Sequence, residues 1–278
     1  MKWSLGEDIP WLLKVTAPRV HALNAYYNRQ HELDNKPFTK SNSLIAKALE
    51  GGAHLTRHEL EAVLKLAGIR AQGPRLAYIV MRAELDAIVC SGAMRGKQHT
   101  YALLDERTPQ TKTLEHETAL AELTRRYFTS RGPATLNDFL RWSSLTAIEG
   151  RDGLALVGNE LESQIVDGTT YWFGPASRVA RNASKPVNDL VQGSDEIIMS
   201  YSESRDDSFR LGNARCYHAV LLDGRLVGHW KPTAKRNSVL VETVLNRKLG
   251  REEKSALNAA INGYGKFVGL TAARPRGK

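Results

Sequence analysis

The chain has 278 residues, 42% hydrophobic and 25% charged, which suits a globular protein of two or three compact units. No apolar run approaches the ~20 residues of a membrane span, and two distant cysteines provide neither a disulfide framework nor a metal cluster. The formal net charge of +9 favours a polyanionic partner, while reduced cysteines and the lack of an N-terminal signal core predict a cytoplasmic protein.

The clearest helical signals come in the first half of the chain. Thr56 and Glu59 form the sequence signature of a capping box, and Pro74 suits the first turn of a further helix. The predicted elements, in chain order, are helices at Ser43–Leu49, Thr56–Gly68 and Pro74–Ile88, then strands at Ile88–Ser91 and Gln98–Leu104. Three helices followed by a hairpin indicate a winged helix, whose third helix would be the recognition helix.

The turn between these two strands is basic and rich in glycine. Gly92 and Gly96 allow the backbone conformations that a tight hairpin needs, and Arg95 and Lys97 at the tip can meet phosphates without burying charge. We therefore interpret this hairpin as a DNA-binding wing.

The same order of elements recurs with weaker signals. Thr135 followed by Asp138 repeats the pattern of a cap and a carboxylate, and Gly150 and Gly153 predict that the helix starting at Thr146 is short. The predicted elements are a helix from Glu117 to the residues before Gly132, helices starting near Thr135 and Thr146, and strands at Gln164–Val166 and Thr169–Phe173. The turn Asp167-Gly168 gives this second unit a wing of its own.

The remainder of the chain is predicted to be mostly β. The expected elements are strands at Glu196–Tyr201, Cys216–Leu222, Arg225–Lys231 and Ser238–Leu245, a helix at Arg251–Val268 that closes the sheet, and a basic tail. The turn Asp223-Gly224 is expected to join the middle pair of strands, and Leu257, Ile261, Tyr264 and Val268 to face inward from the helix. The predicted fold class is α+β, with tandem winged-helix units followed by a β-rich C-terminal domain. The predicted domains are a helical remnant at 1–40, winged helices at 41–110 and 111–174, a linker at 175–193 and the C-terminal domain at 194–278.

Several segments resemble the AlkZ-like family of winged-helix DNA glycosylases. The resemblance runs nearly end to end, and its specific parts are the wing and the segment Gly132-Pro133-Ala134-Thr135. Further segments whose sequences are similar to the family are residues 8–13, 16–20, 55–60, 83–86, 126–128 and 167–172. The resemblance implies a monomer that acts on double-stranded DNA carrying alkylated or crosslinked purines, by monofunctional hydrolysis of the N-glycosidic bond and with no cofactor.

One feature of active relatives is absent from the sequence. The family carries a catalytic Gln-x-Gln pair in a first winged helix, upstream of the segment where this chain begins, and such polar groups position the attacking water. The glutamines here are isolated, at Gln30, Gln72, Gln98, Gln110, Gln164 and Gln192. We expect weak or absent catalysis. Either the start assigned to this chain omits an upstream winged helix, or this is a truncated paralogue that binds DNA without cutting the base from its sugar.

Two groups of residues are candidates for DNA contact. The first group is in the wing and consists of Arg95, Lys97, Gln98 and Thr100, and the alternative for it is a solvated hairpin with no ligand. The second group is Arg75, Tyr78 and Arg82, at helical spacing on the polar side of the recognition helix. The alternative for this face is that it packs against a neighbouring unit. Further cations, among them Arg125 and Arg126, suit several elements touching one duplex.

Other residues offer less specific chemistry. Asp195 is the candidate for a catalytic carboxylate, with capping or solvation as its alternative, and Tyr171, Trp172 and Trp230 suit base stacking or the core. His54 and His58 are four apart, but the cap at Thr56 leaves His54 outside the helix, so no metal site is expected. Functions from other classes stay open: a non-catalytic DNA-binding regulator or a protein-interaction module. When bound to DNA, the protein is expected to be associated with the nucleoid.

Overall fold

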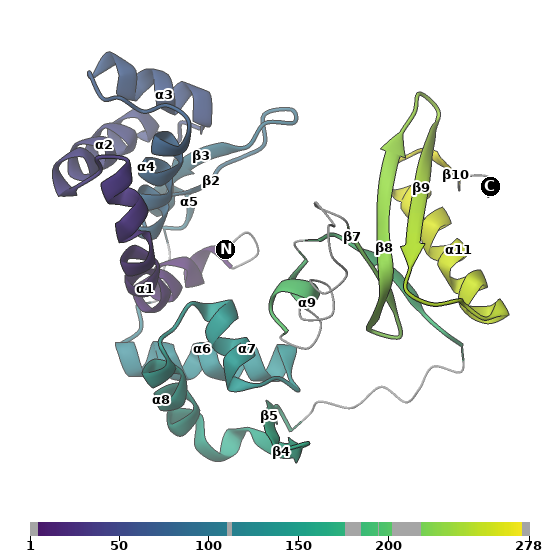
Figure 1. Cartoon of the computed structure of the whole chain (residues 1–278). Helices are drawn as coiled ribbons and strands as arrows, with labels where there is room; N and C mark the ends of the chain where they lie inside the picture. The colour runs from purple at the N-terminus through teal and green to yellow at the C-terminus, as the bar shows by residue number, and fades with distance from the viewer. Residues whose placement is uncertain (1–4, 110–112, 176–184, 194, 202–217, 274–278) are drawn as a thin grey trace. The chain divides into compact units, whose positions relative to one another are not determined.

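The computed structural model describes residues 5–109, 113–175, 185–193, 195–201 and 218–273. The chain divides into two compact units. The first contains Met1–Arg131 and Ser143–Ser163, and the second contains Gly132–Trp142 and Gln164–Lys278. Helices and strands occur in both units, so the predicted α+β class is confirmed (Figure 1).

The first unit begins with helices and a small sheet. Its elements are η1 (Gly6–Asp8), α1 (Ile9–Gln30), α2 (Asn35–Leu49), β1 (Leu55–Thr56), α3 (Arg57–Leu66), α4 (Pro74–Leu85), β2 (Val89–Ser91), β3 (Thr100–Leu103) and α5 (Leu104–Arg107). The three strands form one sheet in the order β1-β3-β2, with β3 antiparallel to both neighbours. The helices α2, α3 and α4 are thus followed by the hairpin β2–β3, which is the order of elements predicted from the sequence.

Local capping explains where these helices begin. Thr56 accepts a hydrogen bond from the backbone of Glu59, whose carboxylate accepts one from the backbone N–H of Thr56, so the predicted capping box is confirmed. Pro74 opens α4 as predicted. The predicted start of α2 at Ser43 is wrong, because Asp34 caps this helix through the backbone N–H of Lys36 and α2 therefore starts at Asn35.

The core of this part is apolar and continuous. Buried side chains from α2, α3, α4 and β2 pack into one cluster, which includes Ile45, Leu60, Leu64, Ile79 and Val89. Because each helix supplies one apolar face, the hairpin β2–β3 is anchored at its base while its turn extends away from the helices (Figure 1).

Two further helices complete the first unit, α6 (His116–Arg131) and α8 (Ala147–Val157), followed by η2 (Gly158–Glu160). The prediction that the helix after Thr146 is short is wrong, because Gly153 serves close packing. A Cβ on Gly153 would lie 2.3 Å from the hydroxyl oxygen of Thr124 on α6. The capping box of Thr146 and Glu149 also stabilises the start of α8.

The second unit contains α7 (Leu136–Ser143) and the hairpin of β4 (Glu162–Val166) and β5 (Thr169–Phe173). The predicted cap is present, since Asp138 accepts a hydrogen bond from the backbone N–H of Thr135 at 2.9 Å. The predicted turn is also confirmed, with Asp167 at φ 49° and Gly168 at φ 76°, the left-handed values that a two-residue hairpin turn of this kind needs.

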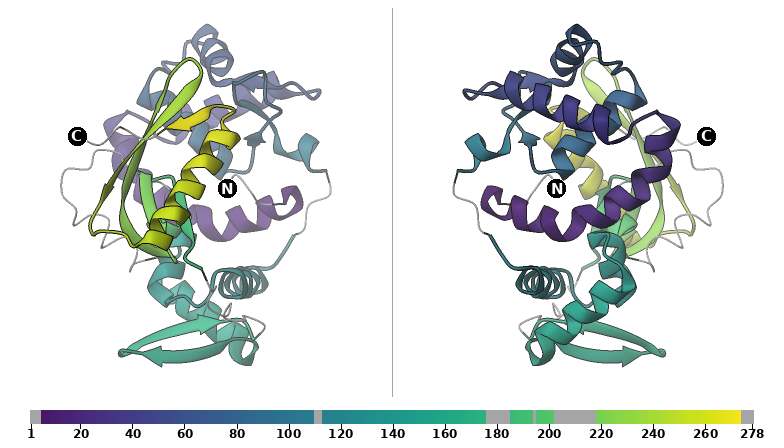
Figure 2. Two further views of the ribbon diagram at one scale, coloured as in Figure 1. Left: turned by 90° about the vertical axis from the view of Figure 1, so that its right-hand side faces the viewer. Right: turned by 90° about the vertical axis from the view of Figure 1, so that its left-hand side faces the viewer.

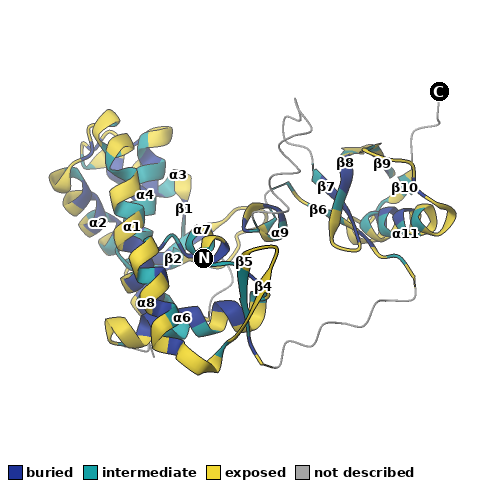
Figure 3. Cartoon of the chain, turned by 60° about the horizontal axis from the view of Figure 1, so that its bottom comes forward, coloured by how far each residue is buried: buried dark blue, intermediate teal, exposed yellow. Residues whose placement is uncertain are grey.

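The C-terminal part of the second unit is a five-stranded sheet with a helix against it. Its elements are β6 (Asn188–Val191), α9 (Glu196–Met199), β7 (His218–Leu222), β8 (Arg225–Ala234), β9 (Ser238–Leu245), α11 (Arg251–Phe267) and β10 (Thr271–Ala273). The strand order is β10-β9-β8-β7-β6, and Figure 2 shows α11 lying along the sheet. Both buried and exposed residues occur along α11, as expected for a helix with one face on a sheet (Figure 3).

Two predictions for this region are wrong, and one strand was not predicted. The predicted linker contains a strand, β6, because its backbone pairs with β7, a segment far away in the sequence. The predicted strand at Glu196–Tyr201 is the short helix α9, because the carboxylate of Asp195 accepts a hydrogen bond from the backbone N–H of Ile197. The strand that was not predicted is β10, which pairs in parallel with β9 after the chain has passed through α11.

Part of the predicted C-terminal architecture lies outside the described residues, namely the basic tail from Arg274 and the first residues of the strand starting at Cys216. The turn Asp223-Gly224 and the strand Ser238–Leu245 are confirmed. Val268 was predicted to face inward, but it follows the end of α11 and is exposed. Within the described ranges, no helix combines the length and the apolar character that a membrane span requires.

Candidate nucleic-acid interface

The turn of the hairpin β2–β3 is tight and exposed. Arg95 and Gln98 exchange backbone hydrogen bonds of 3.0 and 3.1 Å, which leaves Gly96 and Lys97 as the two turn residues. Gly96 has a φ of 61°, which favours glycine at this position. The side chain of Lys97 is exposed and makes no hydrogen bond or ion pair with any residue that the structure describes. The turn therefore presents one unneutralised cation to solvent.

The base of the hairpin is held by Thr100. Its side chain is 3% exposed, and its hydroxyl donates a hydrogen bond to the carbonyl oxygen of Ala93 at 2.5 Å. Gly92 is needed here for close packing, since a Cβ on it would lie 2.4 Å from the Thr100 hydroxyl oxygen. Thr100 is consequently buried within the hairpin, where a phosphate does not reach it.

Arg95 connects the hairpin to the start of α3. Its guanidinium donates to Glu59 Oε1 at 2.6 Å and to the carbonyl oxygen of His54 at 2.5 Å. The hydrogen bond from the Thr56 backbone, followed by the one from Arg95, lowers the pKa of Glu59 to about 2. Arg95 is therefore paired with a carboxylate, whereas Lys97 two residues later is not.

The polar side of α4 is packed against α1. The ring of Tyr78 stacks on that of Tyr27, with centroids 5.9 Å apart and an interplanar angle of 15°, and its centroid is 5.2 Å from that of His31. Arg75 lies nearby and donates from Nε to the carbonyl oxygen of Arg70 at 2.7 Å. Burial lowers the pKa of Arg75.

Arg82 is also engaged within the first unit. Its Nε donates to Asp86 at 2.7 Å, and its guanidinium lies 5.2 Å from the centroid of the Phe38 ring on α2. Asp86 in addition accepts a hydrogen bond from Asn42 and lies 3.2 Å from His21. On this side of α4, Tyr78 is thus packed against α1 and Arg82 against α2. These two residues fit the packed alternative, with helices of their own unit as the neighbours.

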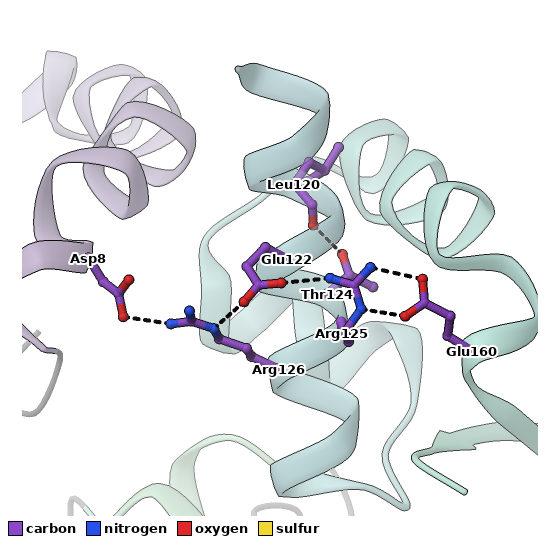
Figure 4. Close-up of polar contacts among 7 residues, drawn as sticks. All are labelled: Asp8, Leu120, Glu122, Thr124, Arg125, Arg126 and Glu160. Atoms are coloured by element: carbon purple, nitrogen blue, oxygen red, sulfur yellow. Dashed lines mark hydrogen bonds and ion pairs between the residues drawn. The ribbon is translucent and has the colours of Figure 1, made fainter. Parts of the chain in front are cut away.

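Arg126 on α6 is neutralised by two carboxylates. It donates to Asp8 and to Glu122, each at 2.6 Å, and Asp8 also accepts a hydrogen bond from the indole N–H of Trp11 (Figure 4). Burial alone would lower the pKa of Arg126, but the bonds to Asp8 and Glu122 raise it. This network fixes α6 to the start of α1.

Arg125 continues the network toward η2. Its guanidinium donates to both carboxylate oxygens of Glu160, at 2.5 and 2.9 Å, and to Glu122 at 2.6 Å (Figure 4). Chiefly through the bond to Glu160, the pKa of Arg125 is raised. Bidentate pairing of this kind holds helices in place. The sequence-based expectation that Arg125 and Arg126 contribute to a duplex-binding surface is therefore not supported by their partners.

Comparisons with known proteins connect this arrangement to a family. The sequence profile described as DNA glycosylase AlkZ-like matches residues 6–267. The chain belongs to the AlkZ-like DNA glycosylase family. Among solved structures, the DNA glycosylase AlkZ of Streptomyces sahachiroi matches with a TM-score of 0.72 at 20% identity, covering 94% of this chain and 76% of that chain. This likeness shows a shared fold. No curated protein matches this AlkZ-like chain.

The remaining candidate residues of this AlkZ-like chain have structural partners. Asp195 caps α9, as described above, and Trp230 is 5% exposed and donates from its indole N–H to the carbonyl oxygen of Val191. Tyr171 and Trp172 lie half-buried on β5, where the backbone of Trp172 pairs with that of Ala134. His54 accepts a hydrogen bond from the backbone N–H of Ala93 and so belongs to the hairpin base.

The sequence analysis named most of the charged side chains of this region but did not predict which of them pair with one another. Glu59 was recognised as a capping residue, but its second partner, Arg95, is 36 positions away. Glu160 is similarly 35 positions from Arg125. A local pattern contains no signal for such pairs, because only the packing of separate elements brings them together.

Proposed function

We propose that this AlkZ-like chain binds duplex DNA through the hairpin β2–β3, in a role related to the repair of damaged bases. The observation that supports this most directly is Lys97, an exposed cation without a carboxylate partner among the described residues, on the turn of an anchored hairpin. A lysine in this position gains affinity from a phosphate and releases counterions, but reads no sequence.

The residues next to Lys97 fit different parts of this task. Arg95 holds the turn against α3, so its proposed contribution is to position Lys97. Gln98 is exposed at the same turn and carries an amide that can donate to a phosphate oxygen. Since Tyr78 packs on α1, Arg82 packs on α2 and Arg75 is bonded to the Arg70 carbonyl oxygen, we assign the duplex contact to the wing of this winged helix.

We further propose that the DNA carries alkylated or crosslinked purines and that base release by this chain is weak or absent. Hydrolysis of the glycosidic bond requires a water held in position by polar side chains. No two glutamines in the 278-residue sequence stand two positions apart, so the family's Gln-x-Gln arrangement is not encoded in it. We also propose that the protein is a cytoplasmic monomer, which associates with the nucleoid when it is bound to DNA.

The wing contact is tested by Lys97→Ala, with Lys65→Ala on α3 as a control that removes the same charge from another exposed position. Affinity for a duplex is measured by fluorescence anisotropy over a series of salt concentrations. Loss of one phosphate contact is expected to weaken binding and to reduce the slope of log affinity against log salt by about 0.9.

Comparison of Lys97→Ala with the control Lys65→Ala shows which result contradicts the proposal. Lys65→Ala is expected to leave the slope nearly unchanged, because its charge is not on the hairpin. If the two variants lowered duplex affinity and the salt slope equally, the attraction would be a general effect of charge and the proposed contact at Lys97 would be wrong. Binding to a protein partner with no measurable affinity for DNA would instead support the interaction-module alternative.

A further inference from the structure

The second unit contains a cavity of about 580 Å³ between the edge strand β6 and the helix α11. This volume lies within the ~300–1,000 Å³ typical of small-molecule sites. Three aromatic side chains, Trp230, Tyr264 and Phe267, line the cavity together with His218 and Asn188. Such a lining of aromatic rings with a few polar groups is also typical of ligand sites.

Asn188 on β6 is an unusual residue for this position. Its side chain is 7% exposed, yet neither its amide nitrogen nor its amide oxygen has a hydrogen-bond partner in the part of the chain that the structure describes. Buried polar groups in folded proteins are almost always hydrogen-bonded, because leaving them unpaired is costly. Both amide atoms are buried and Asn188 lines the cavity, so a ligand that enters beside β6 and displaces the side chains around the amide would supply both partners.

Gly263 and Phe267 stand one turn apart on α11 and both line the cavity. Glycine is unfavourable in the interior of a helix, and a Cβ on Gly263 would meet no other atom within 4 Å. Packing therefore does not require a glycine there, and the absence of a side chain leaves this side of the cavity open. Phe267 is 87% exposed, which leaves a large apolar ring at this site without a covering partner among the described residues.

The aromatic wall opposite is held rigidly. Trp230 packs edge-on against Tyr264, with centroids 4.9 Å apart and an interplanar angle of 71°, and its centroid is 4.8 Å from that of His218. The indole N–H is fixed by the carbonyl oxygen of Val191. Fixed aromatic side chains beside an exposed phenyl ring favour a flat, aromatic ligand.

We propose that this cavity binds an unstacked nucleobase. The amide of Asn188 offers a donor and an acceptor side by side, which matches the adjacent donor and acceptor on a base edge, while Phe267 provides a ring for stacking. The base comes either as a free nucleoside or as a nucleotide within a single strand, since both present the same ring and edge. This site lies wholly in the second unit and does not depend on duplex binding by the hairpin.

The test uses three variants of the full chain that act in different ways. Gly263→Phe fills the open side of the cavity, Asn188→Leu removes the amide at nearly constant volume, and Phe267→Ala removes the exposed ring. Val244→Ala is the control, because Val244 is 74% exposed on β9 of the same unit and does not line the cavity. Thermal unfolding checks the fold, and Asn188→Leu is expected to be at least as stable as the wild type because it removes an unpaired amide.

Binding of the four deoxynucleosides is measured by calorimetry, and binding of short single-stranded oligonucleotides by fluorescence anisotropy. The wild type is expected to bind at least one deoxynucleoside or oligonucleotide saturably, and each cavity variant to weaken that binding by about tenfold or more. Val244→Ala is expected to bind as the wild type does. Saturable binding of oligonucleotides alone would identify the single strand as the source of the base.

The proposal is overturned if no deoxynucleoside and no oligonucleotide binds saturably, or if folded Gly263→Phe and Asn188→Leu bind like the wild type. Duplex affinity of the same variants separates this result from the fate of the hairpin proposal. A loss of duplex binding in Lys97→Ala with nucleoside binding retained places the two sites on different residues.

Discussion

Two cations in one turn have different roles because of their neighbours. Arg95 is held by a carboxylate and a backbone carbonyl, and its planar fork of donors suits such multiple bonds. Lys97 makes no such bond with the described residues and remains available to an anion. At the scale of single residues, charge alone therefore does not show which cation is free to bind an anion; the presence or absence of a nearby carboxylate does.

The partner of Arg95 also predicts a pH dependence. Glu59 has its pKa lowered from 4.5 to about 2, first by the backbone of Thr56 and then by Arg95. A carboxylate whose pKa is lowered on folding stabilises the folded state fully above its unfolded pKa, and this stabilisation is lost as the pH falls toward the folded pKa. We expect Glu59→Gln to remove the part of the stability loss that Glu59 causes between about pH 4.5 and pH 2.

Denaturant midpoints measured across this pH range provide the comparison, with Glu50→Gln as a control that removes an exposed carboxylate at the end of α2. A direct NMR titration of Glu59 in the Arg95→Ala variant complements it. Its pKa should rise relative to the wild type without reaching the ordinary value, because the bond from Thr56 remains. An unchanged titration would contradict the pairing.

Elements defined by neighbouring residues could be predicted from the sequence. The capping boxes at Thr56 and Thr146 and the turns at Asp167-Gly168 and Asp223-Gly224 each depend on a few consecutive residues, and all four are present. The tip of the hairpin β2–β3 was predictable for the same reason. A local pattern carries the complete physical cause of these features.

Elements that depend on distant partners were missed. The strand β6 exists because it pairs with β7, and β10 because α11 returns the chain to β9. The sequence also left open whether the polar side of α4 faces DNA or packs, since only the packing of α1 and α2 covers Tyr78 and Arg82. The amphipathic pattern of α4 distinguishes a polar face from an apolar one, but does not show which faces a neighbouring helix will cover.

Two glycines inside helices provide a test at this scale, because they have opposite surroundings. Gly153→Ala introduces a Cβ 2.3 Å from the hydroxyl oxygen of Thr124, whose position is fixed by its own bond to the carbonyl oxygen of Leu120. Overpacking of this kind is expected to cost about 1–3 kcal/mol in the free energy of unfolding, exceeding the helix-propensity gain of about 1 kcal/mol.

Gly263→Ala is the matched variant, because the new methyl group meets nothing within 4 Å. Only the propensity gain then remains, and we expect stabilisation by up to about 1 kcal/mol. Chemical denaturation of both variants measures whether the free energy of unfolding falls for Gly153→Ala and rises for Gly263→Ala. Stabilisation by Gly153→Ala would mean that α6 and α8 pack less closely than the structure shows.

The net charge of the whole molecule overstates its free cationic surface. Although the formal charge is +9, arginines that the sequence offered as contacts are paired with carboxylates: Arg82, Arg95, Arg125 and Arg126. Ion pairing thus removes many of the candidates that composition suggests. In the first unit, the tip of the hairpin is the part of the predicted interface that keeps both an exposed position and an unpaired cation.

The separation of binding from base release is a prediction for the whole chain. When the 278-residue protein is saturated with a duplex containing an alkylated purine, we expect free base to appear no faster than by spontaneous depurination. The physical reason is that a bound duplex still requires a positioned water, and the sequence has no pair of glutamines at the family's spacing to hold one. Chromatographic measurement of released base, with saturation verified by anisotropy on the same sample, distinguishes absent chemistry from absent binding. Release above the protein-free rate would show that other side chains position the water, and Asp195→Asn would then be the first variant to examine.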